Sequence, residues 1–179
     1  MNKLNIILLV VAIIVLISIV ILILFKYYDD KIKELIKKID KAEKQSYQKL
    51  KEKSKILLRA INLIENKLNI KSKTFEEIKK IKIDSINSFK TESKLDKCFD
   101  EINKIKEDNS KSKKLKTFKE IIDDYNENEL HIISLRTYYN NYTMKYNNLI
   151  KKFPYIIIAK IKKYKLKLLF EGKEIEKEN

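Results

Sequence analysis

The sequence contains almost no residues that interrupt regular structure. Among 179 residues there is one proline, Pro154, and one glycine, Gly172, so residues 1–153 contain neither. Tight hairpins depend on glycine, and glycine and proline mark most turns. The chain is therefore not a sheet of short strands, and we expect long helices joined by few connections.

Cysteine and histidine are each present only once. With Cys98 alone, the chain can form neither an intramolecular disulfide nor a cysteine-rich zinc site. We expect Cys98 to be a small buried hydrophobic side chain. His131 has Glu127 four residues before it, but zinc and di-iron sites need at least three protein ligands. The prediction is that the chain binds no metal and no other cofactor.

Arginine is scarce although the chain is strongly basic. The formal net charge is +15, yet only Arg59 and Arg136 are arginines, which leaves 38 of the 40 basic residues as lysines. Proteins that read nucleic acids favour the planar guanidinium group of arginine for phosphate and base contacts. The excess of lysine therefore does not indicate a nucleic-acid partner.

The motifs of common active sites are also missing. There is no glycine-rich phosphate loop, no Gly-x-Ser-x-Gly and no paired Cys and His. Neighbouring acids such as Asp123 and Asp124 point to different parts of a helix surface, so they do not form an acid/base pair. We expect neither an enzyme nor a small-molecule substrate.

One long apolar run lies near the N-terminus. Every residue from 6 to 25 is apolar except Ser18. Twenty helical residues extend about 30 Å, the thickness of the hydrocarbon core of a bilayer. A cleaved signal peptide would have a shorter apolar region followed by small residues, and residues 24–28 contain none. We expect an uncleaved transmembrane helix at 6–25, behind a short tail at 1–5.

Lysines flank this run unevenly. Lys3 lies before it, whereas seven lysines lie between residues 26 and 44. Positively charged flanks stay in the cytoplasm. The prediction is an N-terminus outside and a cytoplasmic helical domain at 26–170, followed by a charged tail at 171–179.

Beyond the run, apolar residues recur every three or four positions, which is the period of an amphipathic helix. The pattern predicts a first helix that continues to Leu68, a second of 34 residues at 74–107, and a third from 112 to Phe153. Ser93 and Asp96 leave open a split of the second helix near residue 92.

Pro154 ends the third helix because it cannot donate a backbone hydrogen bond. Residues 156–170 after it fit either a helix or an alternating strand. The predicted fold class is all-α: an N-terminal transmembrane helix, then an antiparallel bundle of three long helices plus a short C-terminal segment. A self-associating coiled coil is the alternative.

The third helix carries the most specific pattern in the chain. Two Tyr-Asn pairs, at 139–140 and 146–147, lie seven residues apart; Arg136 precedes the first pair, and Phe153-Pro154 follows the second. This combination closely resembles the LemA family, whose members are bacterial helical-bundle proteins with an N-terminal membrane span. The resemblance is strong over residues 118–171, and it implies an all-helical protein anchored in a bacterial cell membrane.

Three parts of the sequence depart from the family pattern. Asn109-Ser110 stands where many members have Tyr-Pro. Lys163 stands where the family has a glycine, and an element of the first helix is eroded to residues 52–58 of this chain.

The residues of the pattern share one face of the third helix, at spacings of three and four. Two interpretations remain open: a binding groove, or a polar network inside the bundle that fixes the register of the helices. We call this set of residues the stripe, whether structural or for interaction; it comprises Glu129, Arg136, Tyr139, Asn140, Tyr146 and Asn147.

An antiparallel second helix would place two acids level with Arg136. Equal rises along the helices reach Glu52 on the first and Asp84 on the second. Because an unpaired buried guanidinium is costly, we expect Arg136 to be partly buried and paired with one of them, near the hydroxyl of Tyr139. The same geometry returns the next connector to the bilayer and predicts four membrane-facing lysines: Lys111, Lys113, Lys114 and Lys116.

These features predict a single-pass membrane protein whose bundle acts as a scaffold or interaction module. The expected partners are the lipid bilayer and either another membrane or membrane-associated protein or a second copy of the chain. The alternative is a membrane-linked sensory or signalling component that relays a change through the bundle. The few residues before the span argue against it, because they leave little to sense a signal.

Overall fold

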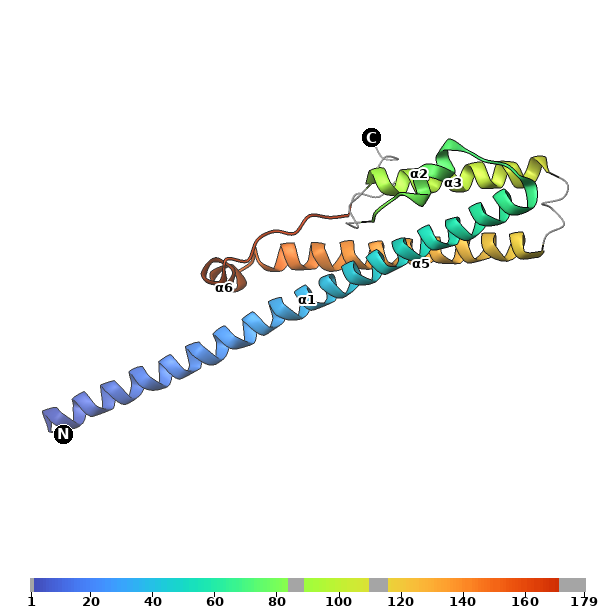
Figure 1. Cartoon of the computed structure of the whole chain (residues 1–179). Helices are drawn as coiled ribbons and strands as arrows, with labels where there is room; N and C mark the ends of the chain where they lie inside the picture. Colours follow the sequence, from blue (N-terminus) through green and yellow to red (C-terminus); the bar gives the residue numbers. More distant parts are fainter. Residues whose placement is uncertain (1, 84–88, 110–115, 171–179) are drawn as a thin grey trace. The chain divides into compact units, whose positions relative to one another are not determined.

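The computed structural model describes residues 2–83, 89–109 and 116–170 (Figure 1). Within these ranges there are five helices and no strand, so the predicted all-α class is confirmed for them. The helices are α1 (Lys3–Leu68), α2 (Lys73–Lys79), α3 (Phe89–Asp108), α5 (Lys116–Leu149) and α6 (Tyr155–Lys162).

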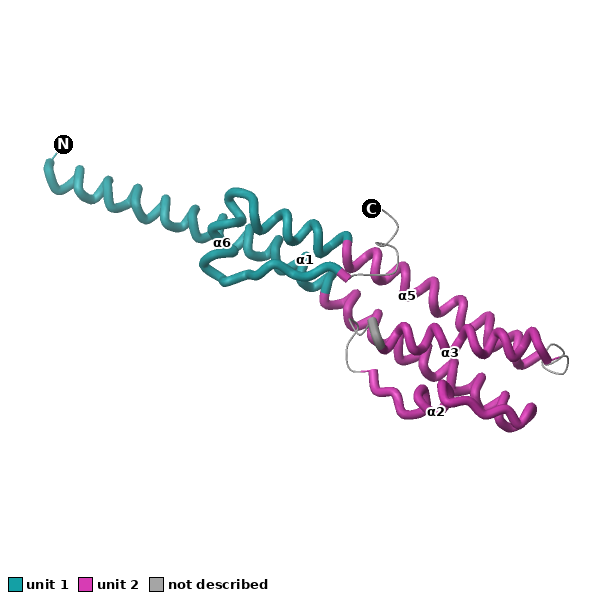
Figure 2. The backbone as a smooth tube through the Cα atoms, turned by 90° about the horizontal axis from the view of Figure 1, so that it is seen from above, with its two compact units in different colours: residues 1–39, 141–169 teal, residues 40–140, 170–179 magenta. Residues whose placement is uncertain are grey.

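The chain divides into two compact units, shown in teal and magenta in Figure 2. Unit 1 comprises residues 1–39 and 141–169, and unit 2 comprises residues 40–140 and 170–179. α1 and α5 each contribute residues to both units, whereas α6 belongs to unit 1 and α2 and α3 belong to unit 2.

α1 is an uninterrupted helix of 66 residues, as expected for a stretch without glycine or proline. Its N-terminal part is long and apolar enough to cross a membrane, and none of that part is buried in the protein. The helix ends before Asn69, whose φ of 55° is in the left-handed region. Asparagine tolerates this conformation better than most residues, so it terminates the helix at little cost.

The hydrophobic core of unit 2 lies among α1, α2, α3 and α5. Each helix supplies buried side chains at the predicted spacing of three and four, and fully burying one such side chain contributes about 1.5–3 kcal/mol. The core includes Leu57, Ile61, Ile64, Phe75, Ile78, Leu95, Cys98, Ile102, Phe118 and Tyr125.

Pairs of interacting side chains give the directions of the helices in unit 2. Arg59 of α1 pairs with Asp124 of α5, and Lys67 lines a hollow with Thr117, so α1 and α5 are antiparallel. The same reasoning makes α3 antiparallel to α5. Glu92, near the start of α3, pairs with Arg136. Asp96, further along α3, accepts a hydrogen bond from Tyr125, which lies nearer the start of α5. α3 therefore runs in the same direction as α1 (Figure 1).

The predicted second helix of 34 residues, antiparallel to the first, is wrong. Its residues form the short α2, a non-helical stretch at 81–83, and α3 beyond residues 84–88, which lie outside the described chain. The hydroxyl of Tyr47 donates to the carbonyl oxygen of Ile83 at 2.7 Å. Since Tyr47 precedes Leu68 by 21 residues, the chain has returned about 30 Å along α1 before α3 begins.

In unit 1, α6 packs on α1. The rings of Tyr28 and Tyr155 meet edge to face with centroids 4.9 Å apart, and the hydroxyl of Tyr164 donates to Asp29 at 2.7 Å. The segment at 156–170 is helical to Lys162 and then irregular, so neither prediction for it holds along its whole length.

The backbone conformation of Lys163 explains why the LemA family, which the chain resembles, has a glycine at this position. It caps α6 with φ 56° and ψ 37°, and its amide donates to the carbonyl oxygens of Ala159 and Lys160. A residue with a Cβ atom is strained in this left-handed conformation, whereas glycine is not.

Candidate functional site: the Tyr-Asn face of α5

A buried lysine joins three helices of unit 2. Lys53 of α1 is fully buried, and its ammonium group donates to Asp96 of α3 at 2.7 Å and to Glu129 of α5. The ammonium also lies 5.2 Å from the ring centroid of Tyr125. Two carboxylates and an aromatic ring replace the water that the charge loses on burial.

Arg136 is paired with Glu92, at the start of α3. The guanidinium group donates to the Glu92 carboxylate and lies 4.2 Å from the ring centroid of Phe170. Glu52 is not its partner, because Glu52 is exposed on α1 and pairs with Lys49 at 2.6 Å. Asp84 lies outside the described residues.

The physical reason for this correction is the direction of α3. Because α3 is antiparallel to α5, its first turn lies level with Arg136, and Glu92 is in that turn. Arg136 and Glu92 are both largely shielded from solvent.

Asn147 of α5 holds one residue of the C-terminal segment in unit 1. Its side-chain amide donates to the carbonyl oxygen of Lys167 at 2.8 Å and accepts from the amide of Lys167 at 2.9 Å. Asn147 thereby satisfies both backbone groups of Lys167, as a neighbouring β-strand would.

Asn140 makes the same pair of bonds in unit 2. It donates to the carbonyl oxygen of Phe170 at 3.0 Å and accepts from the Phe170 amide at 2.7 Å. Seven helical residues separate Asn140 from Asn147, a rise of about 10.5 Å, and three extended residues from Lys167 to Phe170 span about 10 Å. The seven-residue spacing of the Tyr-Asn pairs therefore matches two positions of an extended chain.

The tyrosines of the pattern are buried. The Tyr146 hydroxyl donates to the carbonyl oxygen of Lys165 at 2.8 Å, and burial raises the pKa of Tyr146. Tyr139 is also buried. Thr143 lies between them in the chain and is fully buried.

Comparison with known families matches the LemA family over residues 30–179. The chain belongs to the LemA family. None of the curated proteins compared with the chain matches it. The matched range begins after the apolar run of α1, so the family assignment does not depend on that run.

In this LemA-family chain, the polar groups of the stripe act on the chain itself. Glu129 and Arg136 bind Lys53 and Glu92, and the two asparagines bind backbone groups. Of the two interpretations, these contacts favour a polar network that fixes the register of the helices. They do not favour an open binding groove.

Sequence reasoning missed Lys53, Glu92 and Asp96. Lys53 lies on the apolar period of α1, between the buried residues Leu50 and Leu57. A lysine at such a position is buried only if it is paired. The position of Lys53 in the apolar pattern therefore predicts a buried lysine with acidic partners.

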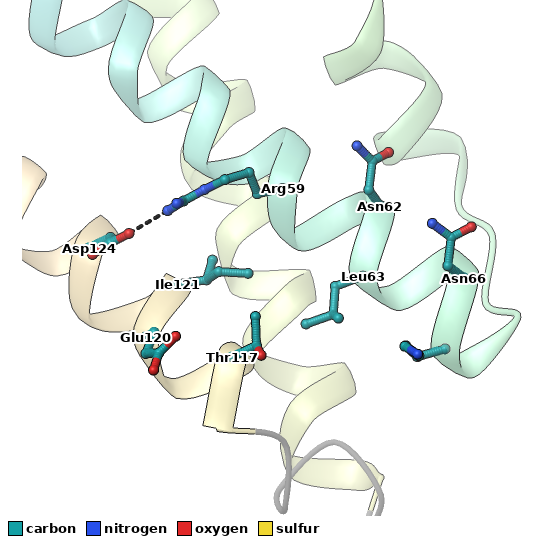
Figure 3. A pocket seen from close by; sticks show the side chains of 9 residues that line it. Arg59, Asn62, Leu63, Asn66, Thr117, Glu120, Ile121 and Asp124 are labelled. Carbon is teal, nitrogen blue, oxygen red and sulfur yellow. Dashed lines mark hydrogen bonds and ion pairs between the residues drawn. The ribbon is translucent and has the colours of Figure 1, made fainter.

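Two hollows lie along the seam between α1 and α5 in unit 2. One has a volume of about 550 Å³, and Figure 3 shows Arg59 reaching from α1 to Asp124 at its edge. The second has about 460 Å³ and is lined by Glu127, Asn128 and His131, among others. Acids, bases, amides and a few apolar side chains line both hollows.

His131 and Glu127 lie 3.7 Å apart on the exposed face of α5. Among residues 2–83, 89–109 and 116–170, no group of three or more His, Cys, Asp or Glu side chains could hold a metal ion.

The prediction of four membrane-facing lysines assumed that the second helix is antiparallel to the first, which is wrong. Lys111, Lys113 and Lys114 lie outside the described residues. Lys116 is highly exposed, but the next residue, Thr117, lies beside Lys67 at the end of α1. The premise that this connector returns to the beginning of α1 is therefore wrong.

Proposed function

We propose that this chain is a single-pass membrane protein whose helical bundle acts as an interaction module, or scaffold, at the membrane surface. One observation carries the proposal: α1 runs without interruption from an exposed apolar stretch into residues that form the hydrophobic core of unit 2. An exposed apolar surface of that length is stable only in lipid or against another protein.

Orientation is part of the same proposal. The N-terminus lies outside the cell and the bundle lies in the cytoplasm. The concentration of lysines after the apolar run supports this arrangement.

The contacts of the charged side chains support a role in binding a partner better than a role in catalysis. Lys53 pairs with Asp96 and Glu129, and Arg136 pairs with Glu92, so these charged groups of unit 2 already bind one another. The seam between α1 and α5 offers a surface for a partner instead. Its exposed groups carry both charges, which suits a membrane or membrane-associated protein with polar and charged side chains.

Site-specific photo-crosslinking of the full chain in membranes tests this proposal. A crosslinking residue at Asn62, which lines the hollow of Figure 3, should give a discrete adduct. The same residue at Lys104, exposed on α3, is the matched control and should not give that adduct. An adduct of two copies of the chain would identify self-association. No discrete adduct at Asn62, or equal adducts at both positions, contradicts the proposal.

A further inference from the structure

A second group of exposed apolar side chains lies in unit 1, far along the chain from the apolar run of α1. Phe153, in the turn between α5 and α6, is 80 % exposed, and Leu168 is 82 % exposed. Ile157 and Ile161, four residues apart on α6, are exposed on the same face. Several exposed apolar side chains within one short segment indicate a binding surface more strongly than a single exposed leucine does.

The same segment is the most basic part of the chain. Residues 130–170 contain no aspartate or glutamate, and residues 141–170 contain eight lysines, about half of the net charge of +15. Seven of the eight are exposed: Lys145, Lys151, Lys152, Lys160, Lys162, Lys163 and Lys165.

Contacts within unit 1 fix the position of this segment along α1. The ammonium group of Lys162 lies 5.9 Å from the ring centroid of Phe25, the last residue of the apolar run. Tyr155 packs on Tyr28, less than one turn further along α1. α6 therefore lies where α1 passes from its apolar run to its polar part, and tyrosine and lysine are the residues that favour this level of a membrane.

Few acids of α1 lie at this level to offset the eight lysines. Asp29 is buried and engaged by Lys33 at 2.6 Å and by Tyr164. The hydrogen bond from Lys33, together with that from Tyr164, lowers the pKa of Asp29, so it stays ionised within this pair of contacts. Asp30 is the only other acid before Glu34.

We propose that the turn between α5 and α6, α6 itself and the segment to Leu168 form a second membrane contact. The exposed apolar side chains enter the boundary between headgroups and acyl chains of the bilayer that α1 crosses, and the lysines bind anionic lipid headgroups. The inference rests on the proposed anchoring by α1, which sets the level of the bilayer.

A hollow of about 450 Å³ in this segment suits the same ligand. Lysines at 151, 160, 163 and 165 surround it, and Ile150, Ile156 and Leu166 supply apolar lining. A mainly apolar hollow bordered by four lysines suits a lipid phosphate with its attached chains, whereas a protein partner would require acids that complement all four lysines.

The chain contains no tryptophan, so a single tryptophan reports on one position. Three full-length variants are reconstituted into vesicles that contain anionic lipids with brominated acyl chains. Phe153→Trp tests the contact. Leu16→Trp, at a position 63 % exposed on α1, tests the anchor, and Leu130→Trp, at a position 68 % exposed on α5 in unit 2, is the control.

The expected result is loss of emission for Phe153→Trp with bromines near the headgroups and for Leu16→Trp with bromines deep in the chains. Leu130→Trp keeps its emission. In vesicles without anionic lipids, Phe153→Trp is quenched less, because the lysines lose their ligands.

The outcomes separate the two proposals. Quenching of Leu16→Trp without quenching of Phe153→Trp overturns the second contact and leaves the anchor intact. A blue-shifted but unquenched Phe153→Trp shows that protein, not lipid, covers the site, which also overturns it. If neither is quenched, the anchoring by α1 fails as well.

Discussion

Asn147 of α5 binds both backbone polar groups of Lys167, donating to its carbonyl oxygen and accepting from its amide. A side chain thus takes the place of a neighbouring strand, and the extended segment after α6 needs no sheet to satisfy this residue. The pair ties the C-terminal segment of unit 1 to α5.

Loss of this pair should destabilise the protein. Asn147→Ala removes two hydrogen bonds and leaves the groups of Lys167 poorly satisfied, so the free energy of unfolding should fall by about 1–3 kcal/mol. Asn148→Ala alters an exposed neighbour of the same type and should change it by less than about 0.5 kcal/mol. Denaturation of the full chain in detergent measures both. Equal effects of the two substitutions would mean that the hydrogen bonds between Asn147 and Lys167 contribute nothing to stability.

The pairing of Arg136 with Glu92 makes a prediction about stranded charge. Glu92→Leu leaves the guanidinium group without its carboxylate and should cost about 3–5 kcal/mol. The double variant Arg136→Met/Glu92→Leu removes both charges and should be more stable than Glu92→Leu alone. Glu52→Gln, on an exposed acid of α1, is the control and should have little effect. A double variant no more stable than Glu92→Leu would count against the pairing.

The helical elements followed from the sequence more readily than their connections did. The absence of glycine and proline and the apolar period predicted α1 and α5 well. The break between α2 and α3 carries no glycine or proline within 80–83, and the contact of Tyr47 with the Ile83 backbone helps to position it. The local sequence pattern does not contain such a tertiary contact. The wrong direction of the second helix then led to Glu52 as a candidate partner of Arg136, whereas Glu52 pairs with Lys49.

The sequence located the Tyr-Asn face and offered a polar network as one interpretation of it, but it did not identify the groups that the face binds. Its regular spacing identified the residues of α5. Their acceptors are backbone groups of Lys165, Lys167 and Phe170, which have no side-chain signature.

Lys163 offers a stabilising substitution. Its positive φ costs a lysine roughly 1 kcal/mol or more that glycine avoids, although glycine loses more entropy on folding. Lys163→Gly should therefore raise the free energy of unfolding by about 0.5–1 kcal/mol. Asn69→Gly is the matched control at the end of α1, and it should gain less because asparagine already tolerates this conformation. A loss of stability in Lys163→Gly, seen in the same denaturation assay, would contradict the left-handed cap.

Cys98 should react slowly with alkylating reagents until the protein unfolds. Burial, with a smaller contribution from Glu101, raises the pKa of the thiol from 9.0 to about 12. The folded chain thus holds almost no thiolate at pH 8, and thiolate is the reactive form. Because the unfolded thiol ionises first, this group contributes stability below pH 9 that is lost as the pH rises towards 12. Alkylation rates with and without denaturant, followed by mass spectrometry, test this; equal rates at pH 8 would show an accessible thiol.

The measurement that bears most directly on the membrane arrangement is protease protection of a tag placed after Asn179 in the full chain. In spheroplasts of a bacterial host, the tag should remain with the membranes and resist added protease until detergent opens the cell, because the lysine-rich side of the anchor stays inside. Digestion of the tag in intact spheroplasts would place the bundle outside and contradict the account.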